Sequence, residues 1–233
     1  VYAFWNNLLY GEVAVYKSTR NGVLQALGWG WEKDDVVKGG MPYWRLALQH
    51  ETGPHSMALG TYGLVANVYA EHDDFAVGTN RFRDIAFDGQ YQYVSDPHIV
   101  TADATWIRER QKWSASVNAG LASNVDSTLT TFRLGAHYFY QRKWGGAVQY
   151  FTTSGTGDSL RYDTGAPVTG SIAGSPNNKG WMAEVNYLPW PTVKLAVRYT
   201  WYREFNGSRD NYAGFGRNAS DNNSLFLLAW LLF

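Results

Sequence analysis

The chain has 233 residues, the size of one ordinary domain, and carries 20 Lys and Arg against 20 Asp and Glu. This neutral balance argues against a nucleic-acid-binding protein, which normally has a basic excess. Cysteine is absent, which excludes disulfides, thiolate metal sites and covalent attachment of c-type haem within this sequence. Aromatic residues make up 16% of the chain. Because Trp and Tyr concentrate where apolar surface meets water, this share is typical of membrane aromatic girdles.

Alternation of apolar and polar residues along the chain predicts ten β-strands. The opening residues 1–5 read as the middle of a strand, and we interpret the chain as a processed or truncated one. The predicted strands span residues 9–16, 43–49, 56–69, 84–93, 100–106, 131–140, 144–152, 181–187, 193–201 and 224–233.

The connections between these strands alternate between short and long. The four tight turns span residues 52–55, 95–98, 141–143 and 188–192, and the long connections span 18–41, 71–80, 107–127, 153–179 and 204–222. An outer-membrane barrel shows this asymmetry, with short periplasmic turns and long extracellular loops. Counting back from Phe233 predicts an even number of strands, with both termini on the periplasmic side.

The C-terminal segment is the strongest single indication of a membrane protein. From Leu225 to Phe233 the residues are all apolar, too few for a transmembrane helix of roughly 20 residues but enough for a transmembrane strand of about 9–11. The segment resembles the closing strand of bacterial outer-membrane barrels, in which a terminal aromatic is read by the insertion machinery. Phe233 is then the insertion signal. We expect an all-β, antiparallel, up-and-down transmembrane barrel of about ten strands, forming one domain over residues 1–233.

Several stretches resemble the C-terminal barrel of bacterial fused cytochrome–porin proteins, which are linked to extracellular electron uptake. The stretches are PYWRLALQHETGPHSMALGTYGL (42–64), DIAFDGQYQYVSDPHIV (84–100), TFRLGAHYFYQRKWG (131–145) and FNGSRDNYAGFGRNASDNNSLFLLAWLLF (205–233). The resemblance implies a porin-like sheath for electron transfer and a c-type cytochrome, as partner or fused module. The family's N-terminal CxxCH haem motif is missing here, so a haem would come only from another module, and no cofactor is expected in this chain.

The strand phases place a near-balanced set of polar residues on the face that would line the barrel interior. The candidates are Glu12, Arg45, Asp84, Asp88, Asp103, Arg133, His137, Glu184, Lys194 and Arg198. Charges in a low-dielectric wall persist when they are paired, so the near balance predicts interior ion pairs. The set fits a structural network filling a narrow barrel, because roughly eight strands enclose only side chains. It also fits a narrow polar lumen for a small solute, or contacts to an enclosed module.

Two further possibilities rest on loop residues. Glu71, His72, Asp73 and Asp74 could bind a divalent metal, but adjacent polar residues on a loop are usually solvated, and no metal site is expected. Barrel enzymes that work with Asp and His above the bilayer exist, and Asp210 lies on a second loop. The Asp–His pairing such an enzyme needs near its last loops is missing.

The expected role is therefore a non-enzymatic, porin-like barrel in the bacterial outer membrane. Its expected partners are outer-membrane lipid, the barrel-insertion machinery and, through the resemblance, a cytochrome; nucleic acid is not among them. A narrow solute pore or a purely structural barrel is the first alternative, and a barrel enzyme is the second.

Overall fold

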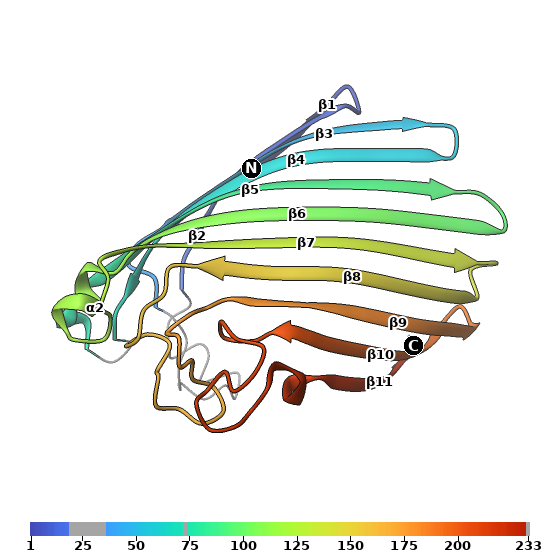
Figure 1. Cartoon of the computed structure of the whole chain (residues 1–233). Coiled ribbons are helices and arrows are strands. Elements are labelled where there is room, and N and C mark those ends of the chain that lie inside the picture. Colours follow the sequence, from blue (N-terminus) through green and yellow to red (C-terminus); the bar gives the residue numbers. More distant parts are fainter. Residues whose placement is uncertain (19–35, 72–73, 232–233) are drawn as a thin grey trace.

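The computed structural model describes residues 1–18, 36–71 and 74–231, and it shows one antiparallel sheet of eleven strands. The strands pair strictly in chain order, so the sheet has an up-and-down topology, with β1 at the top and β11 at the bottom of Figure 1. The strands are β1 (Tyr2–Trp5), β2 (Leu9–Tyr16), β3 (Met41–Thr52), β4 (His55–Tyr69), β5 (Thr79–Val94), β6 (His98–Lys112), β7 (Asp126–Tyr140), β8 (Trp144–Gly155), β9 (Asn178–Trp190), β10 (Val193–Glu204) and β11 (Ser224–Leu231).

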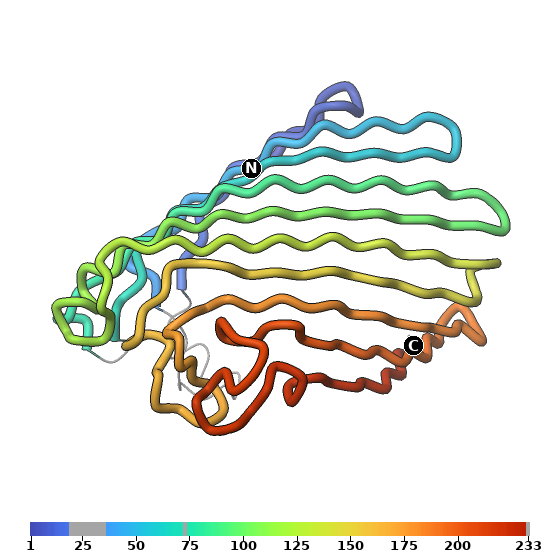
Figure 2. Tube along the Cα trace, in the orientation of Figure 1, coloured from blue at the N-terminus to red at the C-terminus, as the bar shows by residue number. Residues whose placement is uncertain are grey.

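The connections separate by length onto the two ends of the sheet, as Figure 2 shows. The short ones join β1 to β2, β3 to β4, β5 to β6, β7 to β8 and β9 to β10, and none exceeds three residues. We call this the turn end. The long ones gather at the other end, which we call the loop end; there lie the short helix α2 (Ser114–Asn118) and the 3-10 turns η1 (Phe75–Val77) and η2 (Ala219–Asn222). The predicted segregation of connections by length is confirmed for the described residues.

The predicted strand count was one too low. β1 pairs with β2 from Tyr2↔Glu12 to Trp5↔Leu9, through a turn in which Asn6 and Asn7 both have φ of 51°. Positive φ at both central residues defines the tight hairpin turn for which asparagine is well suited. With β1 present, Val1 lies midway along β2, where its amino group donates to the Val13 carbonyl oxygen at 2.8 Å. The prediction that both termini lie at the turn end was therefore wrong for the N-terminus.

Several strands also extend further toward the loop end than the sequence pattern predicted. β5 begins at Thr79 instead of residue 84, and β6 continues to Lys112 instead of residue 106. In these extensions the outward positions are charged from Arg81 to Arg83 and from Arg108 to Lys112, so the apolar alternation stops while the backbone hydrogen-bond ladder continues. Arg83↔Arg110 and Arg81↔Lys112 are directly paired there.

Side chains divide cleanly between two faces of the sheet because residues paired across strands point to the same side. One face carries most of the large apolar residues, and many are exposed: Leu46 is 51% exposed, Leu59 67% and Val185 65%. We call this the apolar face. The opposite face, which we call the polar face, carries the ten candidate residues.

The sheet is open among the described residues: β1 pairs only with β2, and β11 only with β10. The prediction of an all-β, antiparallel, up-and-down sheet is confirmed, whereas the expected closure into a barrel is not seen. A single sheet layer has no core between two layers, and many of the buried side chains lie instead in the connections at the loop end. Tyr212, in the β10–β11 connection, is fully buried, and its hydroxyl donates to the Val168 carbonyl oxygen at 2.7 Å.

No helix in the part of the chain that the structure describes has the length and apolar character needed to cross a bilayer.

Asp158 joins two of the long connections at the loop end. Its Oδ2 accepts hydrogen bonds from the backbone N–H groups of Ser123 (2.8 Å) and Asn124 (3.0 Å), and its Oδ1 from those of Leu160 (3.0 Å) and Arg161 (3.2 Å). Burial raises the pKa of the Asp158 carboxyl, but these four donors outweigh burial and hold the pKa below its usual range.

We predict that this carboxylate makes the loop end sensitive to acid. Because its folded-state pKa is lowered, its contribution to stability is complete above the unfolded value of about 3.9 and is lost as the pH falls through the folded-state pKa. Asp158→Asn should lower the free energy of unfolding by about 2 kcal/mol at neutral pH and flatten its acid dependence. Urea unfolding over a pH series checks this, with Asp163→Asn, on the same connection, as the control. An unchanged acid slope in Asp158→Asn would contradict the assignment.

Candidate functional site on the polar face

The polar face of the sheet carries all ten predicted candidate residues. Cross-strand partners link them: Glu12↔Arg45, Asp88↔Thr105, Thr105↔Arg133 and Glu184↔Arg198 are direct pairs on this side. The structure joins seven of the ten into three clusters, two of them ion pairs and one a histidine–carboxylate contact, and leaves Glu12, Asp84 and Arg133 outside them. That this face lines a lumen stays a prediction.

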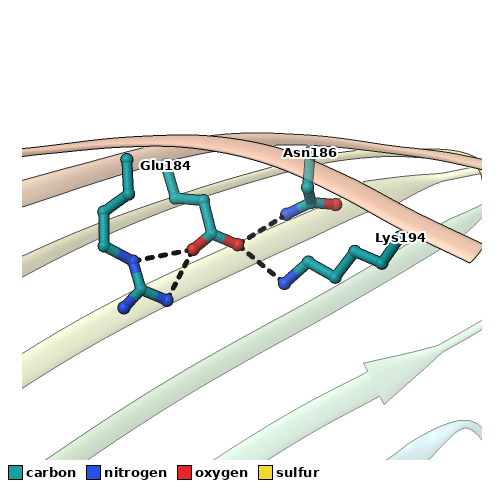
Figure 3. A network of polar contacts seen from close by, with 4 residues as sticks. Glu184, Asn186 and Lys194 are labelled. Carbon is teal, nitrogen blue, oxygen red and sulfur yellow. Dashed lines mark hydrogen bonds and ion pairs between the residues drawn. The ribbon is translucent and has the colours of Figure 1, made fainter. Parts of the chain in front are cut away.

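The largest cluster is built around Glu184 on β9, and Figure 3 shows its contacts. Glu184 Oε2 accepts from Arg198 Nε (2.9 Å) and Nη2 (2.6 Å), while Oε1 accepts from Lys194 Nζ (2.8 Å) and Asn186 Nδ2 (3.2 Å). The carboxylate is only 6% exposed, whereas the two cations are 33% and 40% exposed. Two cations around one buried acid leave a local positive excess on this part of the face.

The second cluster spans three strands. Arg45 on β3 donates through Nη2 to Asp88 Oδ2 on β5 at 2.6 Å, across β4. Gly60 of β4 lies beneath this contact: a Cβ atom there would come within 2.6 Å of Asp88 Oδ1 and 2.8 Å of Arg45 Nη2. A glycine at this position therefore lets the pair meet. The Arg45 guanidinium also lies 5.4 Å from the centre of the Tyr62 ring.

The third cluster follows the same plan. His137 Nε2 lies 3.1 Å from Asp103 Oδ1, and Gly135, directly paired with Asp103, leaves room for the carboxylate. A Cβ atom on Gly135 would approach Asp103 Oδ1 to 2.8 Å. Both side chains are more than a third exposed, so this contact is more accessible to solvent than the carboxylate of Glu184.

The remaining three candidates have other surroundings. Glu12 accepts a hydrogen bond from the Tyr10 hydroxyl at 2.9 Å. Asp84 is paired across the strands with Glu109, which sequence reasoning did not single out. Arg133 lies between Thr105 and Phe151 in the register, and it forms no ion pair with any described residue.

A row of tyrosines on the polar face was not anticipated. Tyr2, Tyr10, Tyr16, Tyr43 and Tyr62 come from β1 to β4, and the ring centres of successive contacts lie 5.9–6.3 Å apart. Tyr10 and Tyr43 precede Glu12 and Arg45 by two residues, and this spacing could have placed them on the polar face from sequence alone. These tyrosines form two contact groups on the polar face, Tyr2 with Tyr10 and Tyr43 with both Tyr16 and Tyr62.

A cavity of about 370 Å³ lies at the loop end of the polar face. Asp84 and Glu109 line it, together with Trp113 and Arg161. The Arg161 guanidinium stacks on the Trp113 ring at 3.5 Å and donates to Gln111 Oε1 at 3.0 Å. Burial lowers the pKa of Arg161. Arg161 comes from the long β8–β9 connection, so alternation along strands could not have revealed it.

The loop residues considered as metal ligands are not brought together among the described residues. No group of three or more His, Asp or Glu side chains is placed to hold a metal ion there. Asp74 instead accepts a hydrogen bond from the Ala76 N–H at the start of η1, and His72 and Asp73 lie outside the described residues. His50 and the turn histidines His55 and His98 pair with residues of the apolar face. Phe233 also lies outside the described residues.

Comparison with known proteins gives no family assignment: the chain matches no protein-family model, and no curated protein matches it.

We predict that Gly60→Ala separates the Arg45–Asp88 pair and lowers the free energy of unfolding by about 1 kcal/mol, because the pair is only partly buried. Gly146→Ala is the matched control: it is also a mid-strand glycine, but a Cβ atom there has its nearest neighbour at 3.6 Å. That control should be neutral or slightly stabilising. Urea unfolding measures both.

A double-mutant cycle makes the Gly60 prediction specific. Asp88→Asn should destabilise the wild type but should have little further effect in the Gly60→Ala background, because the pair is already broken. Additive effects of the two substitutions would contradict the role assigned to Gly60.

Proposed function

We propose that this chain forms the wall of a β-barrel in the bacterial outer membrane, a porin-like scaffold whose apolar face contacts lipid. The observation that carries the proposal is the belt of exposed apolar side chains on one face. Leu59, Val185 and Leu227 belong to it, and each is more than 60% exposed. A soluble protein rarely exposes a contiguous apolar patch larger than a few hundred Å².

The belt has the height that a bilayer requires. On β5 its outward residues run from Ile85 to Tyr93, a span of nine residues. A tilted transmembrane strand needs about 9–11 residues to cross the hydrocarbon layer. Arg83 follows at the loop end, so the apolar stretch is bounded by charge.

Aromatic side chains frame the belt at both ends. Toward the turn end, the His55 and His98 rings pack on Tyr91 and Tyr138, and each Nδ1 lies 2.8 Å from the tyrosine hydroxyl. Trp144 stacks on Tyr187 at the same end, with ring centres 4.2 Å apart.

Toward the loop end, Phe87 packs with Trp106, Tyr150 with Trp181, and Tyr199 with Trp201. Two aromatic levels separated by aliphatic residues are typical of the two membrane interfaces. The short connections would then face the periplasm and the long ones the exterior.

The polar face supports a scaffold more than a selective pore. Its clusters pair acids with bases, whereas a selective channel presents rings of one sign. Pairing also offsets the cost of holding charge in a low-dielectric wall. The cytochrome–porin resemblance adds a narrower proposal, that the barrel encloses a haem-bearing module supplied by another segment or chain.

We predict that Val148→Arg prevents stable insertion while Gln149→Arg does not. Val148 is 43% exposed on the apolar face of β8, and the adjacent Gln149 points to the polar face. A cation on the lipid-facing side near the bilayer centre costs about 2–4 kcal/mol, whereas a lumen position tolerates it. Refolding of the full chain into phosphatidylcholine vesicles, followed by protease protection, measures insertion. Equal insertion of both variants, or a monomeric wild type that folds in water without lipid, would contradict the proposal.

The electron-conduit proposal has its own test. A c-type cytochrome should co-purify with the chain from the outer membrane. In vesicles with an entrapped redox dye, the pair should pass electrons from an external reductant faster than either component alone. A rate no higher than that of the cytochrome alone would contradict this proposal and leave the membrane barrel unaffected.

A further inference from the structure

Five exposed cations interrupt the apolar face at the loop end of β5 and β6. They are Arg81, Arg83, Arg108, Arg110 and Lys112, and we call them the basic patch. The register pairs Arg83 directly with Arg110 and Arg81 with Lys112, while Arg108 is paired with Ile85. All five therefore share the face that carries Phe87 and Trp106.

The protein does little to neutralise this charge. None of the five cations forms an ion pair with a residue that the structure describes. Asp126 is paired with Lys112 in the register but lies beyond ion-pair distance. Like charges directly opposite each other destabilise a β-pair, so β5 and β6 carry a repulsion that a bound anion would relieve.

The patch is local and hollowed. The outward positions of the flanking strands at this level carry no cation: Asn67 pairs with Arg81, Thr128 with Arg110 and Thr130 with Arg108, and the one charged neighbour among them is the acid Asp126 opposite Lys112. A general ring of interfacial cations would have continued onto these strands. Arg81, Arg83, Arg110 and Lys112 line a groove of about 310 Å³ together with Gln111 and Asp126.

The location of the patch indicates what it binds. Guanidinium groups match phosphate oxygens with paired hydrogen bonds. Four residues along β5 from Arg83, roughly 13 Å, lies Phe87, which is 53% exposed and packs with Trp106. Exposed apolar side chains therefore lie beside the anion-binding cations. An acyl chain attached to the anion could pack on them, whereas a free phosphate could not.

We propose that the basic patch binds the phosphate-bearing headgroup of an anionic lipid in the leaflet at the loop end, with the acyl chains lying over Ile85, Phe87 and Trp106. This inference rests on the proposed membrane barrel.

The test compares lipid selection by full-length variants in phosphatidylcholine vesicles that contain or lack a minor fraction of phosphatidic acid. Native mass spectrometry of protein released from these vesicles counts the bound lipids. Wild type should retain phosphatidic acid in preference to phosphatidylcholine. Arg83→Gln/Arg110→Gln should reduce that preference about tenfold, the loss of one to two charge-assisted hydrogen bonds.

Two further variants serve as controls. Arg142→Gln/Lys143→Gln removes the same charge at the turn end and should keep the preference. Arg83→Lys/Arg110→Lys keeps the patch charge and should retain more of the preference than the glutamine pair.

Each other outcome overturns the inference. Insertion into pure phosphatidylcholine without any preference for phosphatidic acid would overturn the lipid site and leave the membrane barrel intact. Failure to insert into either vesicle would overturn both. If the turn-end control lost the preference equally, the preference would depend on the net charge of the protein and not on the basic patch. Displacement of phosphatidic acid by inorganic phosphate or a short DNA duplex would assign the patch to a soluble anion.

Discussion

The constraint on which the rest of this structure depends is that a single sheet layer cannot bury its own apolar face. In a two-layer domain, residues such as Leu46, Leu59 and Val185 would meet a second sheet or helices. Here they are at least half exposed across the sheet, and the described loops pack mainly on each other at one end. The apolar side chains then need cover from outside the sheet, and the proposed membrane barrel would supply it as the hydrocarbon layer of a bilayer.

The polar face of the same single layer carries charged side chains, and these are held in pairs. Charges in a thin wall next to hydrocarbon are tolerated when paired, and small residues make the pairing possible. Gly60 and Gly135 each lie where a Cβ atom would press on the carboxylate of a pair. The Glu184 cluster instead places the buried carboxylate centrally and leaves its cations toward solvent. Such clusters fix the register of neighbouring strands, because a slip of one residue would move the charges onto the apolar face.

Alternation along the chain predicted the strands and their order because period-two patterning is a local property. It located residues 9–16 to the residue as β2 and placed all ten candidates on one face. It read residues 1–5 as part of a strand but did not count them as the first of a hairpin, whose signal is the pair Asn6–Asn7. It also ended β5 and β6 too early, where outward arginines replace apolar residues. Contacts made by loops could not be foreseen, because the stacking of Arg161 on Trp113 joins segments 48 residues apart with no periodic signal. Pairing partners such as Arg45 and Asp88 also depend on register, which sequence alone does not fix.

The two edges of the sheet set a condition on the proposed membrane placement. Among the residues that the structure describes, β11 has no partner along its outer edge, which is eight residues long, and both of its faces are apolar: Leu225 and Leu227 on one side, Phe226 and Trp230 on the other. In water such an edge would invite aggregation. In a bilayer its unpaired N–H and C=O groups would find no water, so each would cost several kcal/mol. Membrane residence and an open sheet are therefore incompatible, and placing the apolar face in lipid requires β11 to pair. Its partner must be the β1–β2 edge of this sheet or strands beyond the eleven described. Contact between the apolar belt and lipid therefore requires a closed barrel.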